Sequence, residues 1–136
     1  MTNLLALADR VEKAEAGSRE LDAEIWLATS PGATRKSTTV KSSKGLWPNY
    51  DIDETRDASG RLIIVPEFTA SIDAAMSLVP EGHLWKVGYS RHVPHVAEVV
   101  DYQSHRGTFV AECDSNRAIA LCAAVLRAIA SNRSAS

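Results

Sequence analysis

Basic and aromatic side chains are interleaved in two stretches of this chain. The first stretch contains Arg35, Lys36, Lys41, Lys44, Trp47 and Tyr50. The second contains Lys86, Tyr89, Arg91, His92, His95, Tyr102, His105 and Arg106. Guanidinium and ammonium groups pair with phosphate oxygens, and aromatic rings stack on bases. Both stretches are therefore candidate sites for a nucleotide-type ligand, although the alternation of Trp85 and Tyr89 is also typical of a strand that faces the core.

The other chemically active side chains predict neither a metal site nor a catalytic centre. His92 and His95 could supply two metal ligands, but zinc needs three or four, and no HExxH motif or CxxC pair is present. There is no GxSxG, Walker or GxGxxG motif. Cys113 and Cys122 are expected as buried small side chains in a reducing compartment. We therefore expect a protein that is not an enzyme and has no cofactor.

Length and composition indicate one domain. The chain has 136 residues, of which 45% are hydrophobic, enough for a packed core. Its formal net charge of −2 creates no global attraction to nucleic acid or to membranes. The first residues lack the basic and apolar regions of a signal peptide, and no apolar run reaches membrane-spanning length. An intracellular protein is expected.

The elements that must position these side chains fall into four parts. Residues 1–29 predict a helical segment that is broken near Gly17, either a helical hairpin or one bent helix. Residues 30–65 predict a loop-rich insert with short strands at 38–41 and 62–65. Its acidic run from 49 to 57 is typical of a solvated surface, and Asp57 to Gly60 predicts a turn.

Residues 66–130 predict a core of one helix, three strands and a second helix. Ser71 is a candidate N-cap, and the strands are expected at 84–90, 96–102 and 108–113. The closing helix is expected at 116–130, capped by Asp114 or Ser115, and residues 131–136 form a tail. An antiparallel meander needs apolar helix faces to cover it. The fold class is therefore α+β, an α/β/α sandwich in which the N-terminal helices could cover the second face of the sheet.

Three segments carry a resemblance to a known family. They are 69–85 (TASIDAAMSLVPEGHLW), the closing-helix segment 118–128 (AIALCAAVLRA) and 21–25 (LDAEI). Together they resemble the phage ABA sandwich domain family, whereas residues 34–64 have no counterpart in it. The resemblance implies a small phage or prophage protein with an α/β/α sandwich, located in the cytoplasm of a host bacterium. It implies no activity and no functional residues.

Three functions remain open at this point. The first is a phage-encoded binding protein that antagonises host immunity by sequestering a nucleotide-type signalling molecule, as a homo-oligomer whose interfaces build the pocket. The second is an accessory or inhibitory factor that binds a protein partner. The third is a nucleic-acid-binding domain, because double-stranded RNA-binding domains share the order helix, three strands, helix. The closing helix and tail offer that third function only Arg117, Arg127 and Arg133.

Overall fold

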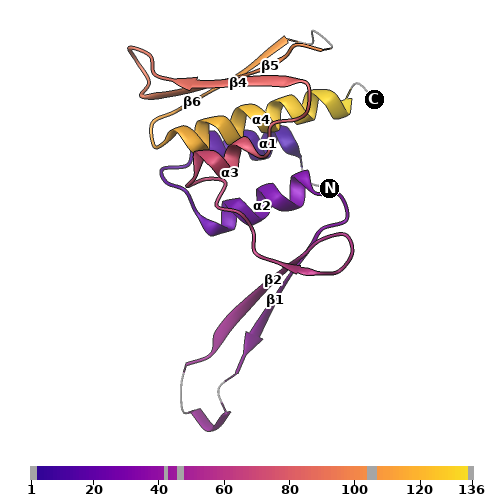
Figure 1. Cartoon of the computed structure of the whole chain (residues 1–136). Helices are drawn as coiled ribbons and strands as arrows, with labels where there is room; N and C mark the ends of the chain where they lie inside the picture. The colour runs from indigo at the N-terminus through magenta and orange to yellow at the C-terminus, as the bar shows by residue number, and fades with distance from the viewer. Residues whose placement is uncertain (1–2, 42, 46–47, 104–106, 135–136) are drawn as a thin grey trace.

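The helices and strands form two regions, a layered body and a projecting arm (Figure 1). The computed structural model describes residues 3–41, 43–45, 48–103 and 107–134. The helices of the body are α1 (Leu4–Glu12), α2 (Arg19–Thr29), α3 (Ile72–Met76) and α4 (Arg117–Ser134). Its antiparallel sheet consists of β4 (His83–Gly88), β5 (His95–Asp101) and β6 (Gly107–Cys113). The arm is made of β1 (Thr34–Val40) and β2 (Tyr50–Arg56), and the short β3 (Leu62–Ile63) pairs with its base. The α+β class and the order of the elements are confirmed.

The N-terminal segment forms two helices rather than one bent helix. Asn3 and Ser18 each accept backbone hydrogen bonds that begin α1 and α2. Gly17 separates the helices at a point where the chain passes close to the body: a Cβ at this position would lie 2.4 Å from the Thr69 carbonyl oxygen. Only glycine permits this approach, so the break that the sequence predicts is a packing requirement.

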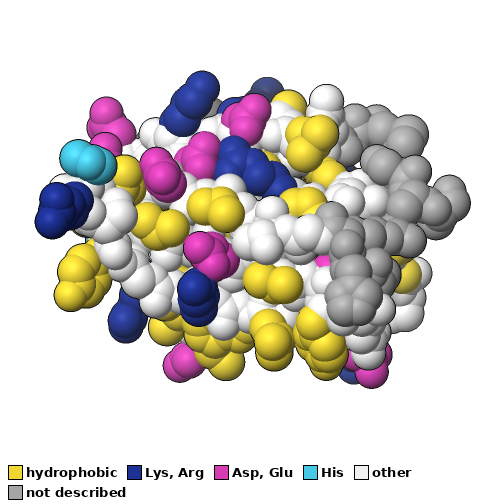
Figure 2. Space-filling view, turned by 90° about the horizontal axis from the view of Figure 1, so that it is seen from above, with side chains coloured by type: hydrophobic (Ala, Val, Ile, Leu, Met, Phe, Trp, Pro, Cys, Tyr) yellow, Lys and Arg dark blue, Asp and Glu magenta, His cyan; other side chains and the backbone are white. Residues whose placement is uncertain are grey.

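The sheet of the body has one covered face and one open face. The three predicted strands are confirmed, with ends that shift by up to two residues. Residues that pair across the strands share a face, and Trp85, Val99 and Phe109 lie in one such row on the covered side. On the open side Leu84 is 61% exposed and Val110 is 42% exposed. Figure 2 views the molecule from this side, where apolar and charged side chains are mixed.

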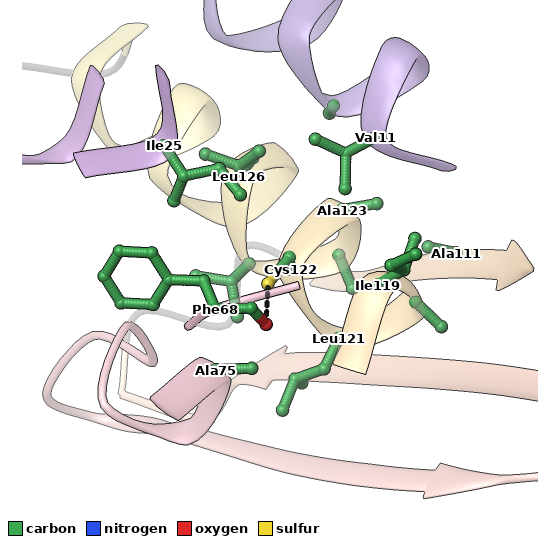
Figure 3. Close-up of a cluster of buried hydrophobic side chains, with 14 of the residues drawn as sticks. Val11, Ile25, Phe68, Ala75, Ala111, Ile119, Leu121, Cys122, Ala123 and Leu126 are labelled. Carbon is green, nitrogen blue, oxygen red and sulfur yellow. Dashed lines mark hydrogen bonds between the residues drawn. The ribbon is translucent and has the colours of Figure 1, made fainter. Parts of the chain in front are cut away.

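Helix α4 is the central layer of the body. Every residue from 118 to 126 is buried, and Figure 3 shows side chains from several elements packed around this helix. Its alanines let α1, α3 and the sheet approach closely from different sides. The N-terminal helices therefore cover α4 rather than the second face of the sheet, so the layer order differs from the expected one. No helix among the described residues is both long and apolar enough to cross a membrane.

A buried polar cluster joins α2 to the segment before α3. Asp22 Oδ1 accepts a hydrogen bond from the Thr69 backbone N–H at 2.8 Å and lies 2.7 Å from the Thr69 hydroxyl. Its Oδ2 accepts from Arg19 at 2.9 Å, and Asn116 Nδ2 donates to the Thr69 carbonyl at 3.2 Å. Two segments that carry the family resemblance meet here. The polar residues that they contribute have structural roles, because buried polar groups must be hydrogen-bonded.

The arm replaces the loop-rich insert that the sequence predicts. Strand β1 is longer than the expected strand at 38–41, and β2 lies in the run that was expected to be irregular; the two pair over their whole lengths. Six of the seven residues of β1 are exposed and the seventh is half-buried. A strand with both faces in water needs no alternation of apolar and polar residues, which is why the sequence pattern is weak here. The predicted turn at 57–60 is confirmed: Asp57 accepts the N–H groups of Ser59 and Arg61.

Candidate functional site

The outer half of the arm carries exposed apolar side chains on one face. Val40 pairs with Tyr50, and Thr38 pairs with Ile52, so all four side chains lie on the same face. Tyr50 is 51% exposed and Ile52 is 40% exposed. Two-stranded ribbons without a covering layer are marginally stable in water. This face therefore offers aromatic and β-branched contact area that nothing in the described chain covers.

The two strands of the arm carry opposite charges. Arg35 and Lys36 lie on β1, and Lys41 directly follows it, whereas Asp51, Asp53 and Glu54 lie on β2. Arg35 Nη2 is 3.4 Å from Asp53 Oδ2, and the Thr39 hydroxyl donates to Asp51 at 2.6 Å. Within the described part of the chain, Lys36, Lys41 and Lys44 form no ion pair. The first predicted group is thus gathered on the arm, except for Trp47, which lies outside the described residues.

The second predicted group is divided between the two ends of the body sheet. Tyr89, Arg91 and His92 lie in the β4–β5 connection, and His95 begins β5. Tyr102 follows the other end of β5, about 20 Å away at the usual rise of a strand. His105 and Arg106, also in that connection, lie outside the described residues. Tyr102 therefore does not form one site with the described residues of the β4–β5 connection, because the seven-residue strand β5 separates them.

Strand β4 carries one further member of the second group, Lys86, together with Trp85, which alternates with Tyr89 in the sequence. Lys86 lies on the open face of the sheet, where Nζ is 3.2 Å from Glu98 Oε2. Trp85 packs against the core, whereas Tyr89 lies beyond the last residue of β4 and is 88% exposed. The core interpretation of the alternating pattern is therefore confirmed for Trp85 and wrong for Tyr89.

Tyr89 and His95 border one hollow of about 640 Å³ near the N-terminus of α4. Arg117, the first residue of that helix, also lines it. The Asn116 side chain accepts the Ile119 N–H at 2.8 Å, so Asn116 caps the helix, not Asp114 or Ser115 as expected. A guanidinium, an imidazole and a phenol around one hollow could contact a phosphorylated aromatic ligand. Arg117 was not among the residues predicted for this group.

An acidic hollow of about 600 Å³ adjoins the first one through Ser115. Its lining includes Glu12, Glu15, Glu112 and Asp114, with Lys13 as a cation. Glu12 also accepts two hydrogen bonds from the Arg127 guanidinium and one from the Glu112 N–H. The hydrogen bonds from Arg127 are the main reason that the pKa of Glu12 is lowered, so this carboxylate stays charged. These acids weaken the attraction of this surface for anions.

In the described part of the chain the cysteines are buried, and no cluster of metal-ligating side chains forms. Both cysteines are buried and free, as expected from the sequence. Cys122 Sγ donates to the Phe68 carbonyl at 3.1 Å (Figure 3), and burial strongly raises the pKa of this thiol. A buried thiol that stays protonated is a poor nucleophile. No group of three metal-ligating side chains is present among the described residues.

Comparisons of the chain with protein-family models, with curated proteins and with solved structures found no match in any of the three. The resemblance to the phage ABA sandwich domain family therefore stays a prediction. Sequence reasoning missed Val40 and Ile52 as candidate contact residues. The period-two spacing of Thr38 with Val40, and of Tyr50 with Ile52, was the available indication.

Proposed function

We propose that this protein binds a protein partner, with the arm as its recognition element. The observation that carries the proposal is the pair of exposed apolar side chains Tyr50 and Ile52, which share a face with the half-buried Val40 on a ribbon that extends from the body (Figure 1). Tyrosine is enriched among residues that dominate binding energy at protein interfaces. Burying each of these side chains in an interface would contribute on the order of 1 kcal/mol or more.

The separation between a body with a buried core and an arm with exposed strands supports this function. The body buries its own apolar side chains, and its hydrophobic core contains no residue of β1 or β2. The arm adds little to that core, since β1 has no buried residue and Thr55, near the base of the arm, is the only buried residue of β2. Such a ribbon is consistent with a segment that becomes covered when another molecule binds. Loops and projecting segments on a rigid scaffold are common carriers of binding residues.

Photo-crosslinking tests this function directly. A photoreactive amino acid is placed at position 52 of the full chain, and the protein is irradiated in an extract of the source organism. We expect one defined protein adduct that disappears in a Tyr50→Ala background. The matched control carries the same amino acid at position 5, where Leu5 is an apolar residue of the body that is 56% exposed, more than the 40% of Ile52. Equal adducts from both positions, or none from position 52, would contradict the proposal.

A second candidate function is the sequestration of a nucleotide-type signalling molecule. The observation that favours it is the convergence of Tyr89, His95 and Arg117 around one hollow. Calorimetry with a panel of cyclic nucleotides and nicotinamide-derived cyclic nucleotides tests it. Tyr89→Ala and Arg117→Ala should abolish binding and Arg61→Ala should not. Ligand that is recovered unaltered after heat denaturation supports sequestration, and altered ligand indicates an enzyme. Absence of binding across the panel contradicts this function for those ligands.

A further inference from the structure

Strand β1 has one edge that no other strand among the described residues covers. The order of the small sheet is β1-β2-β3, so β2 is central and β1 is an edge strand. Every second residue of an edge strand points its backbone N–H and C=O away from its neighbour. An extended segment of another protein can pair with such groups as an additional strand. The free edge of β1 therefore has the backbone chemistry for strand addition.

Strand β2, which pairs with the other edge of β1, shows what kind of strand β1 can bind. The two strands pair antiparallel over seven residue pairs, from Thr34 opposite Arg56 to Val40 opposite Tyr50. The Arg35–Asp53 ion pair and the Thr39–Asp51 hydrogen bond join the basic strand to the acidic one. Opposite charges on facing strands stabilise a pair, and like charges destabilise it. The arm itself is thus an example of an acidic strand bound to β1.

Two lysines of the arm that form no ion pair in the described residues define what the free edge would select, although Lys36 lies opposite Glu54 in the strand register. Lys36 lies on β1 and Lys41 directly follows it; both are exposed and neither has an ion-pair partner in the described residues. We propose that the free edge of β1 binds an acidic extended segment of the protein partner, which adds to the arm as a further antiparallel strand. This inference rests on the proposed function and names the chemistry of its partner.

The arm also predicts the order of residues in that segment. In an antiparallel register, one acidic residue of the segment would face Lys41 and another would face Lys36. Four residues of the segment would lie between these two acids. The residues that face Val40 and Thr38 would be apolar or β-branched, because those side chains share a face with Tyr50 and Ile52. From its N-terminus, the segment would therefore have an acidic, an apolar, a polar, an apolar, a polar and an acidic residue. A peptide Asp-Val-Thr-Ile-Thr-Glu has this pattern.

Two other occupants of this edge are disfavoured by charge. If two copies of the chain paired their β1 strands antiparallel about Thr38, Arg35 of each would face Lys41 of the other, and like charges on facing strands repel. A nucleic acid laid along the arm would meet the carboxylates of Asp51, Asp53 and Glu54 on the adjacent strand. An acidic strand at the β1 edge contacts the lysines and is one strand away from these carboxylates.

Fluorescence anisotropy with the labelled hexapeptide and the full-length protein tests the inference. We expect saturable binding that weakens by up to about fivefold for each of Lys36→Gln and Lys41→Gln, the range for exposed ion pairs. Lys13→Gln, which removes an exposed lysine of the body, should leave the affinity unchanged. A peptide with Asn and Gln in place of its acids should bind more weakly, and alternate N-methylation of its backbone should reduce affinity about tenfold or more because hydrogen bonds are lost.

The possible results separate this inference from the proposed function. Absence of binding, or binding that is indifferent to N-methylation, would overturn strand addition. If a single-stranded oligonucleotide competed with the peptide through the same lysines, the edge would be a nucleic-acid site and the inference would be wrong. A position-52 adduct that depends on Tyr50 but is unaffected by the lysine variants would leave the proposed function standing and overturn the inference alone. Circular dichroism of each variant verifies that it is folded.

Discussion

The body and the arm of this protein are stabilised in different ways. In the body, α4 is buried from residue 118 to residue 126, and a buried carboxylate at Asp22 is fully hydrogen-bonded. In the arm, paired strands are held by the backbone ladder, one ion pair between the strands and a few exposed side-chain contacts. The comparison shows where a short chain can present side chains to another molecule without weakening its own core. The predictions below test this difference.

The largest expected effect is the loss of a core aromatic side chain. Phe68 is only 2% exposed and packs beside α4 (Figure 3), so Phe68→Ala should lower the free energy of unfolding by about 3–5 kcal/mol through burial loss and cavity formation. Tyr50→Ala in the arm should change it by less than about 0.5 kcal/mol. Urea unfolding followed by circular dichroism measures both. Similar losses for the two variants would show that the arm is part of the cooperative core.

The same comparison can be made with one carboxylate from each region. Asp22→Ala leaves the Thr69 N–H buried without its acceptor, which should lower the free energy of unfolding by about 3 kcal/mol. Asp53→Ala removes a partly exposed ion pair with Arg35 and should cost about 0.5 kcal/mol or less. Chemical denaturation of both variants at neutral pH is the measurement. An Asp22 variant as stable as the parent would mean that the polar cluster contributes nothing net.

A smaller effect is expected from the ion pair between α1 and α4. The pKa of Glu12 is lowered from its ordinary value of 4.5, mainly by hydrogen bonds from Arg127. A carboxylate whose pKa is lower in the folded state stabilises that state above the unfolded-state pKa, and this contribution is lost as the pH falls through the folded-state value. Glu12→Gln should therefore cost about 1 kcal/mol at neutral pH and progressively less below about pH 4.

The control for this pH dependence lies in the arm. Glu54→Gln removes a carboxylate that, like its ion-pair partner Arg56, is partly exposed, and the stability of this variant should follow that of the parent at every pH. Thermal unfolding of the three proteins across the acidic range provides the comparison. If Glu12→Gln kept a constant deficit at low pH, the Arg127 contact would not be the cause of that deficit.

Removal of the arm should destabilise the body less than any of the substitutions in the body. Thr34 and Arg56 pair at its base, so a short Gly-Ser turn can replace residues 35–55 without separating the flanking chain ends. The free energy of unfolding of the body should change by less than about 1 kcal/mol, because little apolar surface of the arm is buried. The excised protein should also lose the position-52 adduct and hexapeptide binding. Loss of cooperative unfolding would contradict the separation of the two regions.

The candidate binding residues show how far sequence reasoning extends. It identified Arg35, Lys36 and Lys41 as a basic group, and the structure places the first two on β1 and the third directly after it. It also grouped Tyr89 with Tyr102, which lie at opposite ends of β5. Residues that are near in sequence are separated in space when they flank a strand. No local pattern reveals this until the strand pairing is known.

What the sequence by itself determined is the set of body elements: the cap at Ser71, the break at Gly17, the alternating strands and the apolar closing helix. These features follow from burial of one face, which leaves a periodic trace in the residues. Only the tertiary structure decided that α1 and α2 cover α4, that one face of the sheet stays open, and that residues 34–40 and 50–56 form an arm. A ribbon exposed on both faces buries neither, so its sequence carries no such trace and its form depends on pairing between distant residues.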